Sequence, residues 1–198
     1  MSDELARSRE QLRQQLRMRR RALPATSRIQ AAERLAQQLL SMPLAPESGH
    51  VAGYWAMDGE IALHVWQLQL PAKCIYCLPV LHDDRLRFAP WRPGDALVSN
   101  RFGIPEPDVA ADSLIDAREM MLVVVPLVGF DRSGNRLGMG GGWYDRSFDF
   151  RQEQPAPPWL VGAAFADQQV DTIKSADWDV ALDAVCTDTG NFDCRADI

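Results

Sequence analysis

Six short apolar runs, each four to eight residues long, are spread along the 198-residue chain and limit what it can fold into. They lie at residues 51–55, 74–80, 86–89, 121–128, 160–165 and 184–187. Their length and partial alternation predict β-strands, and helical patterns at residues 61–70 and after Gly142 separate some of them. Strands that alternate with helices predict an α/β fold with a mostly parallel, buried central sheet.

A single domain is the expected organisation. At 46% hydrophobic residues, the chain has the length and apolar content of one globular domain with a sizeable core. We therefore expect residues 1–198 to form one domain, with residues 191–198 as a loose tail. No run of about 18 apolar residues occurs, so the sequence predicts no membrane-spanning helix. The acidic start lacks the apolar core of a secretory signal, which favours a cytoplasmic location.

The four cysteines are expected to be reduced, because a domain of this size needs no disulfides to hold its core. Cys74 and Cys77 have the spacing of a metal or redox pair. In a predicted strand, however, residues three apart face opposite sides, which argues against such a site.

Two helices are predicted before the first strand. Four leucines share one face of a helix at residues 3–22, which Pro24 ends: Leu5, Leu12, Leu16 and Leu23. A second helix is expected from residue 26 or 27 to about residue 40, with its inner face formed by Ile29, Ala32, Leu35, Ala36 and Leu39.

The first helix is strongly basic. Residues 1–21 hold seven arginines against three acidic residues, so a segment of net charge +4 is attached to a body of net charge −10. Four of the arginines form a stripe beside the leucine face: Arg9, Arg13, Arg17 and Arg20. From that margin they can reach a cleft and bind phosphates, whereas the alternative is a solvated stripe. The acidic body and the lack of interleaved aromatic residues argue against extended nucleic-acid binding.

A glycine-rich segment follows the fourth apolar run and precedes a predicted helix. Gly138, Gly140, Gly141 and Gly142 let the backbone adopt positive φ and direct successive N–H groups at one point. Such a nest ahead of a helix N-terminus predicts a phosphate-binding loop, and a flexible hairpin is the alternative. The segment matches neither the P-loop nor the dinucleotide fingerprint.

Charged residues flank the glycine loop. Arg136 lies two residues before it and can clamp phosphate oxygens, while Asp145 lies three residues after it and can hold a divalent cation. Alternatively, Asp145 is only a partner of the helix dipole. Asp177, Asp179 and Asp183 precede the last apolar run, and any of them could supply a second cation ligand or simply cap a loop.

Residues 54–61 follow the first predicted strand, an ordinary position for a ligand loop in an open α/β sheet. Trp55, Met57 and Glu60 combine apolar and carboxylate groups that suit a pterin-like ring, by stacking and by accepting hydrogen bonds from its N–H edge. The alternative is that Trp55 and Met57 belong to the core.

The motif Gly-Phe-Asp-x-x-Gly-Asn-Arg-Leu-Gly-x-Gly-x-Gly-x-Tyr-Asp at residues 129–145 resembles the signature of the 5-formyltetrahydrofolate cyclo-ligase family. Residues 9–13, 54–61, 101–107 and 179–187 fall in that family's order, so the resemblance covers nearly the whole chain. It implies a single-domain three-layer α/β/α sandwich. It also implies an enzyme that uses ATP and Mg²⁺ to convert 5-formyltetrahydrofolate to 5,10-methenyltetrahydrofolate, with release of ADP and phosphate. Separately, we expect the protein to be a monomer.

The resemblance also implies roles for individual residues. The ATP-binding positions are Arg9, Arg13, Arg136, Leu137, Gly138, Met139, Gly140, Gly141, Gly142, Trp143 and Tyr144. The folate-binding positions are Trp55, Met57, Glu60 and Tyr144. Arg136 and Asp145 carry the chemistry, and Asp145 and Asp179 bind magnesium. The chain departs from the family pattern at Trp143, where tyrosine or phenylalanine is commoner, and before Asp179, where proline and histidine are missing, which leaves Asp177 as an alternative ligand.

The implied chemistry agrees with the residues present. A formamide oxygen is a poor leaving group and must be phosphorylated before the N10 amine can close the ring, so the protein needs to align the reactants and stabilise charge. No protein nucleophile is required, and no Ser-His or Cys-His arrangement is legible. A catalytically silent ATP- or folate-binding module is the alternative, although such a module should have lost Asp145, Arg136 or the glycines.

Overall fold

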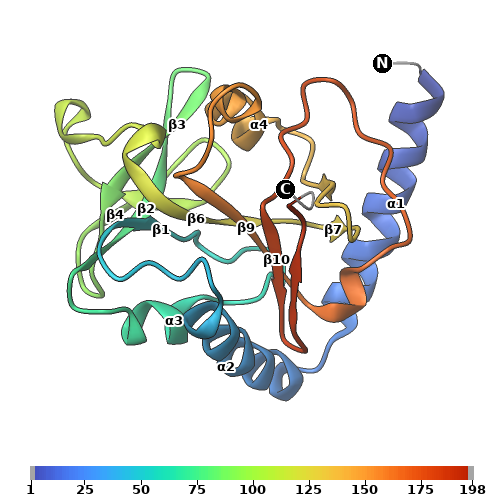
Figure 1. Ribbon diagram of the computed structural model, residues 1–198, viewed down its shortest axis with the longest axis horizontal. Helices are drawn as coiled ribbons and strands as arrows, with labels where there is room; N and C mark the ends of the chain where they lie inside the picture. The colour runs from blue at the N-terminus through green and yellow to red at the C-terminus, as the bar shows by residue number, and fades with distance from the viewer. Residues whose placement is uncertain (1–2, 196–198) are drawn as a thin grey trace.

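The computed structural model describes residues 3–195, and its centre is a seven-stranded sheet with helices on both faces (Figure 1). The helices are α1 (Asp3–Ala22), α2 (Ala25–Ser41), α3 (His64–Gln69) and α4 (Trp143–Ser147). The strands of the main sheet are β1 (Gly49–Ala52), β2 (Cys74–His82), β3 (Arg85–Pro90), β6 (Met120–Pro126), β9 (Trp159–Ala164), β10 (Ala184–Thr187) and β11 (Asn191–Asp193). Two small sheets pair β4 (Leu97–Ser99) with β5 (Pro105–Pro107), and β7 (Gly129–Phe130) with β8 (Arg136–Leu137).

The order of the main sheet is β11-β10-β9-β6-β1-β2-β3. The five inner strands are parallel to one another, and only β3 and β11 at the two edges run antiparallel. The chain leaves β1 toward β2 and β3, and then returns to place β6 on the other side of β1. This reversal creates a topological switch point between β1 and β6, and open α/β sheets bind ligands outside the carboxyl ends of such strands.

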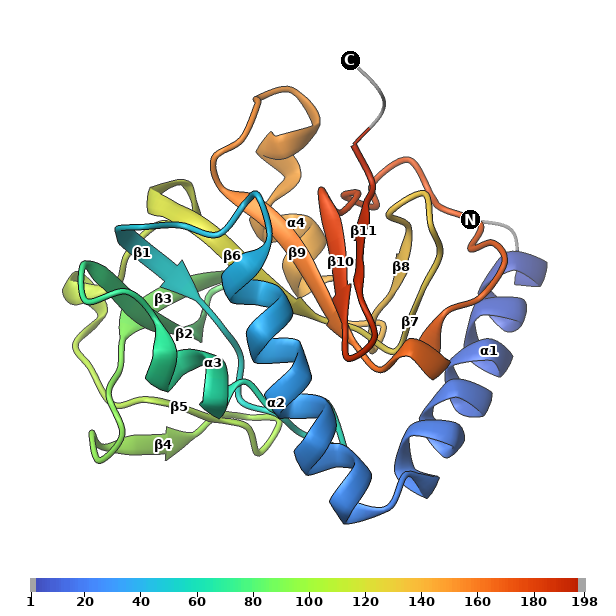
Figure 2. The ribbon, with the colours of Figure 1, turned by 60° about the horizontal axis from the view of Figure 1, so that its bottom comes forward.

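Two apolar cores confirm the predicted three-layer arrangement. On one face, α2 and α3 pack against the sheet through Leu35, Trp66 and Val124. On the other face, Phe148 after α4 and Phe150 in the following 3-10 helix (Asp149–Gln152) pack on the sheet. Figure 1 shows α2 and α3 below the sheet and α4 above it, and Figure 2 turns the α2 face forward.

The predicted helices differ in detail from the observed ones. Helices α1 and α2 agree with the prediction to within two residues, but Ile29 is 59% exposed because it lies about 120° around the helix from the buried Leu35. Helix α3 begins only at His64; residues 61–63 are irregular, and Ile61 and Leu63 are buried in the core. The helix expected after Gly142 has five residues and passes into a 3-10 turn.

The expectation of a loose tail at residues 191–198 is wrong for residues 191–193. The chain turns at Gly190, where the backbone N–H of Thr187 donates to the carbonyl of Gly190, and returns as β11. The ring of Phe192 then packs on that of Phe130, with centroids 5.7 Å apart. Residues 196–198 lie outside the described part of the chain.

The cysteines lie as expected. Cys74 packs in the α2 core and Cys77 in the opposite one, and all four cysteines are free thiols. Among residues 3–195, no helix is long and apolar enough to cross a membrane.

Helix α1 belongs to neither helical layer. It lies at the carboxyl edge of the sheet, where Leu16 is buried among Val128, Leu137 and Ile173. Both views place α1 beside the β7 hairpin. Close approach is possible because residue 129 is glycine: a Cβ there would lie 2.4 Å from Cδ1 of Leu16.

Leu16→Ala is expected to lower the free energy of unfolding by about 2 to 5 kcal/mol, because it leaves a cavity under α1. Met18→Ala is the matched control, since Met18 lies on the same helix and is 64% exposed. Urea unfolding followed by circular dichroism measures both. Equal losses in the two variants would show that Leu16 does not anchor α1.

Candidate active site

Two segments meet at the switch point. Residues 53–60 follow β1, and residues 127–142 follow β6 and contain the glycine loop. Helix α1 lies across both, because Arg13 hydrogen-bonds the glycine loop and Arg20 hydrogen-bonds Asp58 and Leu127. The structure therefore brings together three regions that are far apart in the sequence.

The β7–β8 hairpin positions Arg136. At its turn, the buried carboxylate of Asp131 accepts hydrogen bonds from the backbone N–H groups of Ser133 and Asn135 and from the side chain of Asn135. Gly134 turns the chain with φ of +81°. The same carboxylate accepts a 2.8 Å hydrogen bond from the N–H of Ile173, so the hairpin is fixed to the segment before β10. Asp131, Gly134 and Asn135 of the motif therefore support the position of Arg136.

The glycine loop has the backbone freedom that the sequence predicts. Gly140 and Gly142 have φ of +94° and +66°, a region that L side chains rarely adopt. The Nε of Arg13 donates a 2.7 Å hydrogen bond to the carbonyl of Gly138, which fixes the start of the loop to α1. Helix α4 has only five residues, so its dipole contributes little. Loop N–H groups and arginines are the main local sources of positive potential.

Arg136 and Asp145 form a largely buried ion pair beneath the loop. An Nη atom of Arg136 lies 2.5 Å from Oδ1 of Asp145, and the guanidinium also donates to the carbonyl of Val180. The N–H of Val180 donates a 3.1 Å hydrogen bond to Oδ1 of Asp145. The pair therefore joins β8, α4 and the segment before β10.

A second ion pair joins the helix to the segment before β10. Arg9 lies 2.7 Å from Oδ2 of Asp179, which also accepts a 2.9 Å hydrogen bond from the N–H of Ala176. The alternative ligand Asp177 is exposed. Asp183 is paired with Arg151, and its other oxygen caps the start of β9 at Leu160, so its role is structural.

The donor chemistry fits a magnesium ion in part. Among residues 3–195, no group of three or more His, Cys, Asp or Glu side chains is placed to hold a metal. Asp145 and Asp179 nevertheless offer hard carboxylate oxygens, and Mg²⁺ in nucleotide sites typically uses one or two carboxylates together with substrate phosphates. The residues present are compatible with that arrangement.

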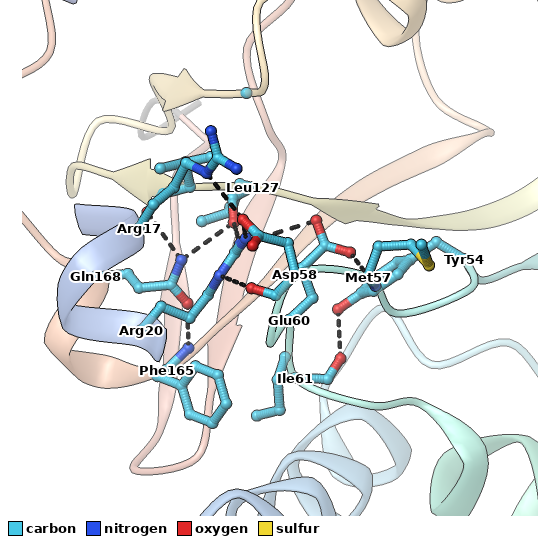
Figure 3. A network of polar contacts seen from close by, with 12 residues as sticks. Arg17, Arg20, Tyr54, Met57, Asp58, Glu60, Ile61, Leu127, Phe165 and Gln168 are labelled. Atoms are coloured by element: carbon cyan, nitrogen blue, oxygen red, sulfur yellow. Dashed lines mark hydrogen bonds and ion pairs between the residues drawn. The ribbon is translucent and has the colours of Figure 1, made fainter. Parts of the chain in front are cut away.

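Asp58 forms ion pairs with Arg17 and Arg20, the two remaining arginines of the stripe (Figure 3). Its carboxylate lies 2.8 Å from Nε of Arg17 and 2.9 Å from an Nη atom of Arg20, and it also pairs with Arg21. Burial raises the pKa of Asp58, but the hydrogen bonds from Arg17 and Arg21 outweigh burial and hold this pKa below its usual value. The arginine stripe is therefore bound to the body, and the alternative of a solvated stripe is wrong.

Glu60 is the last residue of the turn at residues 57–60. Its Oε2 accepts a 2.9 Å hydrogen bond from the N–H of Met57, and its side chain is 12% exposed. Burial raises the pKa of Glu60, whereas the Met57 N–H and the charge of Arg20 lower it. Burial also raises the pKa values of Tyr54 and Tyr144, and the charge of Glu60 raises them further, so both rings lie near this carboxyl group.

Aromatic residues border the site. Trp55 is partly exposed and packs edge to face on Trp91, with centroids 5.7 Å apart. Phe102 packs in the same way on Trp143 at 6.0 Å, and the guanidinium of Arg101 lies over the Trp143 ring. The segment that carries Arg101 and Phe102 is therefore in contact with the end of the glycine loop.

The predicted site residues differ in accessibility. Met57 and Met139 expose their side chains, but the side chain of Leu137 is fully buried against α1, which leaves only its backbone for a ligand. Sequence reasoning missed Asp58 and Trp91 as parts of the site. A signal existed for Asp58, which lies next to Gly59 two residues before Glu60, but none existed for Trp91.

The fold and the site together define a class of protein: a doubly wound α/β protein whose candidate site lies at the switch point between a basic glycine loop and a carboxylate-bearing loop. The sequence profile of the 5-formyltetrahydrofolate cyclo-ligase family matches residues 6–188, and the chain belongs to that family.

Curated relatives agree with this assignment. The chain is 36% identical to the 5-formyltetrahydrofolate cyclo-ligase of Haemophilus influenzae, over 88% of this chain and 94% of the relative. It is 34% identical to the enzyme of the same name from Escherichia coli K12, over 87% and 96%. The solved structure of Aquifex aeolicus 5,10-methenyltetrahydrofolate synthetase superposes with a TM-score of 0.81 at 25% identity, over 96% of this chain and 94% of that one.

Because its pKa is depressed, ionised Asp58 stabilises the fold above its unfolded pKa of about 4, and this contribution is lost as the pH falls through the lower folded pKa. We therefore expect the difference in unfolding free energy between wild type and Asp58→Asn to be largest near neutral pH and to shrink in acid. Denaturant titrations across pH measure it, with exposed Asp112→Asn as the control. A difference that does not change with pH would contradict the assignment.

Proposed function

We propose that this protein uses ATP to convert 5-formyltetrahydrofolate to 5,10-methenyltetrahydrofolate, with release of ADP and phosphate. The observation that carries the proposal is the Arg136–Asp145 pair beneath a glycine loop at the switch point, in a member of the cyclo-ligase family. An arginine and a carboxylate beside a phosphate-sized backbone nest suit a metal-nucleotide substrate.

ATP would bind between α1 and the glycine loop. Arg13 extends from α1 to the carbonyl of Gly138, Arg9 extends from α1 to Asp179 in the segment before β10, and Arg136 pairs with Asp145 just after the loop. The loop N–H groups from Gly138 to Tyr144 would bind phosphate oxygens. Each of these three guanidinium groups is paired with a carboxylate, and each offers N–H donors that suit phosphate oxygens.

Asp145 and Asp179 would hold the magnesium ion. When bound, the ion neutralises charge on the phosphate oxygens and so assists phosphoryl transfer. Each carboxylate is fixed by an arginine and by a backbone N–H group, so neither side chain is free to turn away from the site.

The folate would bind against residues 54–60. Glu60 can accept hydrogen bonds from the N–H edge of the pterin ring, and its burial makes such a bond stronger than it would be in water. Trp55 and Met57 offer exposed apolar surface in the same loop, and the charge of Glu60 raises the pKa of Tyr144 just after the glycine loop.

The reaction then requires that the formyl oxygen of the folate be aligned with the γ-phosphate of ATP. The formyl oxygen attacks the γ-phosphorus of ATP, and ADP leaves. The N10 amine next attacks the activated formyl carbon and loses its proton, and the C–O bond breaks to release phosphate. Arg136 and the loop N–H groups stabilise the charge that spreads over the transferred phosphoryl group, and no covalent enzyme intermediate is needed.

The setting of the reaction is part of the proposal. Free cysteines and the absence of a membrane-spanning helix among residues 3–195 support a cytoplasmic enzyme, and we expect it to act as a monomer on small molecules without nucleic acid. A catalytically silent binding module is the alternative.

The test is incubation of the purified protein with 5-formyltetrahydrofolate, ATP and Mg²⁺, following the methenyl product by its absorbance. Product in the complete mixture, and none when ATP or Mg²⁺ is omitted, would support the proposal. If no product forms, a thermal shift with ATP or folate would indicate the silent module, since only a ligand that binds the folded state raises its stability.

Asp145→Asn is expected to abolish turnover without unfolding the protein. The asparagine keeps the Oδ1 acceptor for Arg136 and for the N–H of Val180, but it loses the negative charge that a metal ligand needs. Turnover and thermal unfolding measure the two effects. Near-normal turnover would refute the metal-binding role.

Arg136→Ala is expected to raise the KM for ATP and to lower kcat by about a hundredfold, because it removes a donor aimed at the developing charge. Arg132→Ala is the control, since Arg132 is exposed on the same hairpin and lies over the Phe192 ring. Similar kinetics for the two variants would contradict the role of Arg136 in binding phosphate oxygens.

A further inference from the structure

Arg20 is the one residue of the arginine stripe whose side chain is completely buried. Its Nε donates a 3.1 Å hydrogen bond to the backbone carbonyl of Asp58, and its Nη atoms lie 2.9 Å from the Asp58 carboxylate and 3.8 Å from that of Glu60. It also donates a 3.3 Å hydrogen bond to the carbonyl of Leu127. One guanidinium group therefore joins α1 to both segments that meet at the switch point.

The turn that presents Glu60 has an unusual backbone. Asp58 has φ of +52°, which is uncommon for a residue other than glycine, and Gly59 has φ of +77°. The turn is closed by a 2.9 Å hydrogen bond from the N–H of Glu60 to the carbonyl of Met57. Because Arg20 binds the carbonyl of Asp58 at this position of positive φ, it stabilises the conformation of the turn that carries Glu60.

On its other side, Arg20 reaches a second buried network. The carbonyl of Leu127 also accepts a 3.1 Å hydrogen bond from Gln168, whose amide donates to the carbonyl of Val128 as well. The side-chain oxygen of Gln168 accepts from the N–H of Phe165. Figure 3 shows Arg20 between this network and the Asp58 turn, so the turn is fixed to the ends of β6 and β9.

We propose that Arg20 is a positioning residue for the folate substrate: it acts through Glu60, by fixing the turn at residues 57–60 against the end of β6. This inference rests on the proposed function. In this proposal the arginine stripe of α1 has two functions: Arg9 and Arg13 bind the nucleotide, and Arg20 positions the folate-binding turn.

The charge of Arg20 also bears on the ionisation of Glu60. The charged or titratable groups that face Glu60 are Arg20 on α1, Asp58 in its own turn, Tyr54 after β1 and Tyr144 on α4. Arg20 is the only cation among these four groups. Without it, burial and the charge of Asp58 would raise the pKa of Glu60 further, so the ionised acceptor would be lost at a higher pH as the solution is acidified.

The experiment compares Arg20→Met, Arg20→Lys and Arg21→Met. Arg21 is the matched control, because it is the neighbouring residue and pairs with the same Asp58 carboxylate from an exposed position. The dissociation constant for 5-formyltetrahydrofolate is measured by calorimetry without ATP. The KM for each substrate and the pH dependence of kcat/KM for the folate are then measured by methenyl absorbance.

In Arg20→Met we expect folate affinity to fall about tenfold or more, because a buried, charged hydrogen-bonding group is lost. The KM for ATP should stay within about threefold, and the acid limb of kcat/KM should move to higher pH. Arg20→Lys keeps the charge but not all the hydrogen bonds, so its acid limb should stay in place while its affinity is intermediate. Arg21→Met should remain within about threefold of wild type throughout, since exposed ion pairs contribute little.

Equal effects of Arg20→Met and Arg21→Met would overturn the inference, as would equal increases in the two KM values. If Arg20→Met does not fold, Arg20→Lys decides: an unchanged folate affinity in that variant overturns the inference. A wild-type protein that binds folate without turning it over would refute the proposed catalysis, whereas the folate-binding comparison would still test Arg20.

Discussion

The burial of Leu16 against Leu137 and Ile173 is the contact on which the rest of the site depends. This contact holds α1 across the carboxyl edge of the sheet, away from both helical layers. Without it, the arginines of α1 would have no fixed position relative to the two loops at the switch point. A small apolar cluster thus positions the large cluster of charges beside it, which is reasonable because apolar packing is insensitive to salt, whereas exposed charge pairs are screened.

Much of the fold could be predicted from the sequence because strand and helix periodicities are local. The six apolar runs all correspond to strands, and the leucine face of residues 3–22 corresponds to α1. The pairing order of the strands could not be predicted from these local patterns, because it depends on contacts between distant segments. The strand at residues 191–193 was not predicted for that reason. A three-residue edge strand has no periodicity of its own, and only the turn at Gly190 brings it beside β10.

The sequence predicted the candidate site only where residues of suitable chemistry lie close together in the sequence. Glycines followed by a carboxylate indicated the phosphate loop, and the spacing of arginines indicated a functional face on α1. Asp58 could be noticed beside Gly59, but its pairing with three arginines of α1 could not be predicted, because only the folded protein defines the conformation of its turn. The roles assigned to Asp145, Asp179 and the folate-facing residues stay predictions, although the structure gives most of them neighbours of suitable charge.

The position of α1 has a consequence for the order in which the protein is made. A chain emerges from the ribosome N-terminus first, so α1 is synthesised long before its partners. Leu16 needs Ile173, and Arg9 needs Asp179, both of which lie in the last quarter of the chain. The apolar face of α1 therefore stays incompletely covered until residues 173–179 have been synthesised. The site is assembled only when α1 meets segments more than 100 residues away in the sequence.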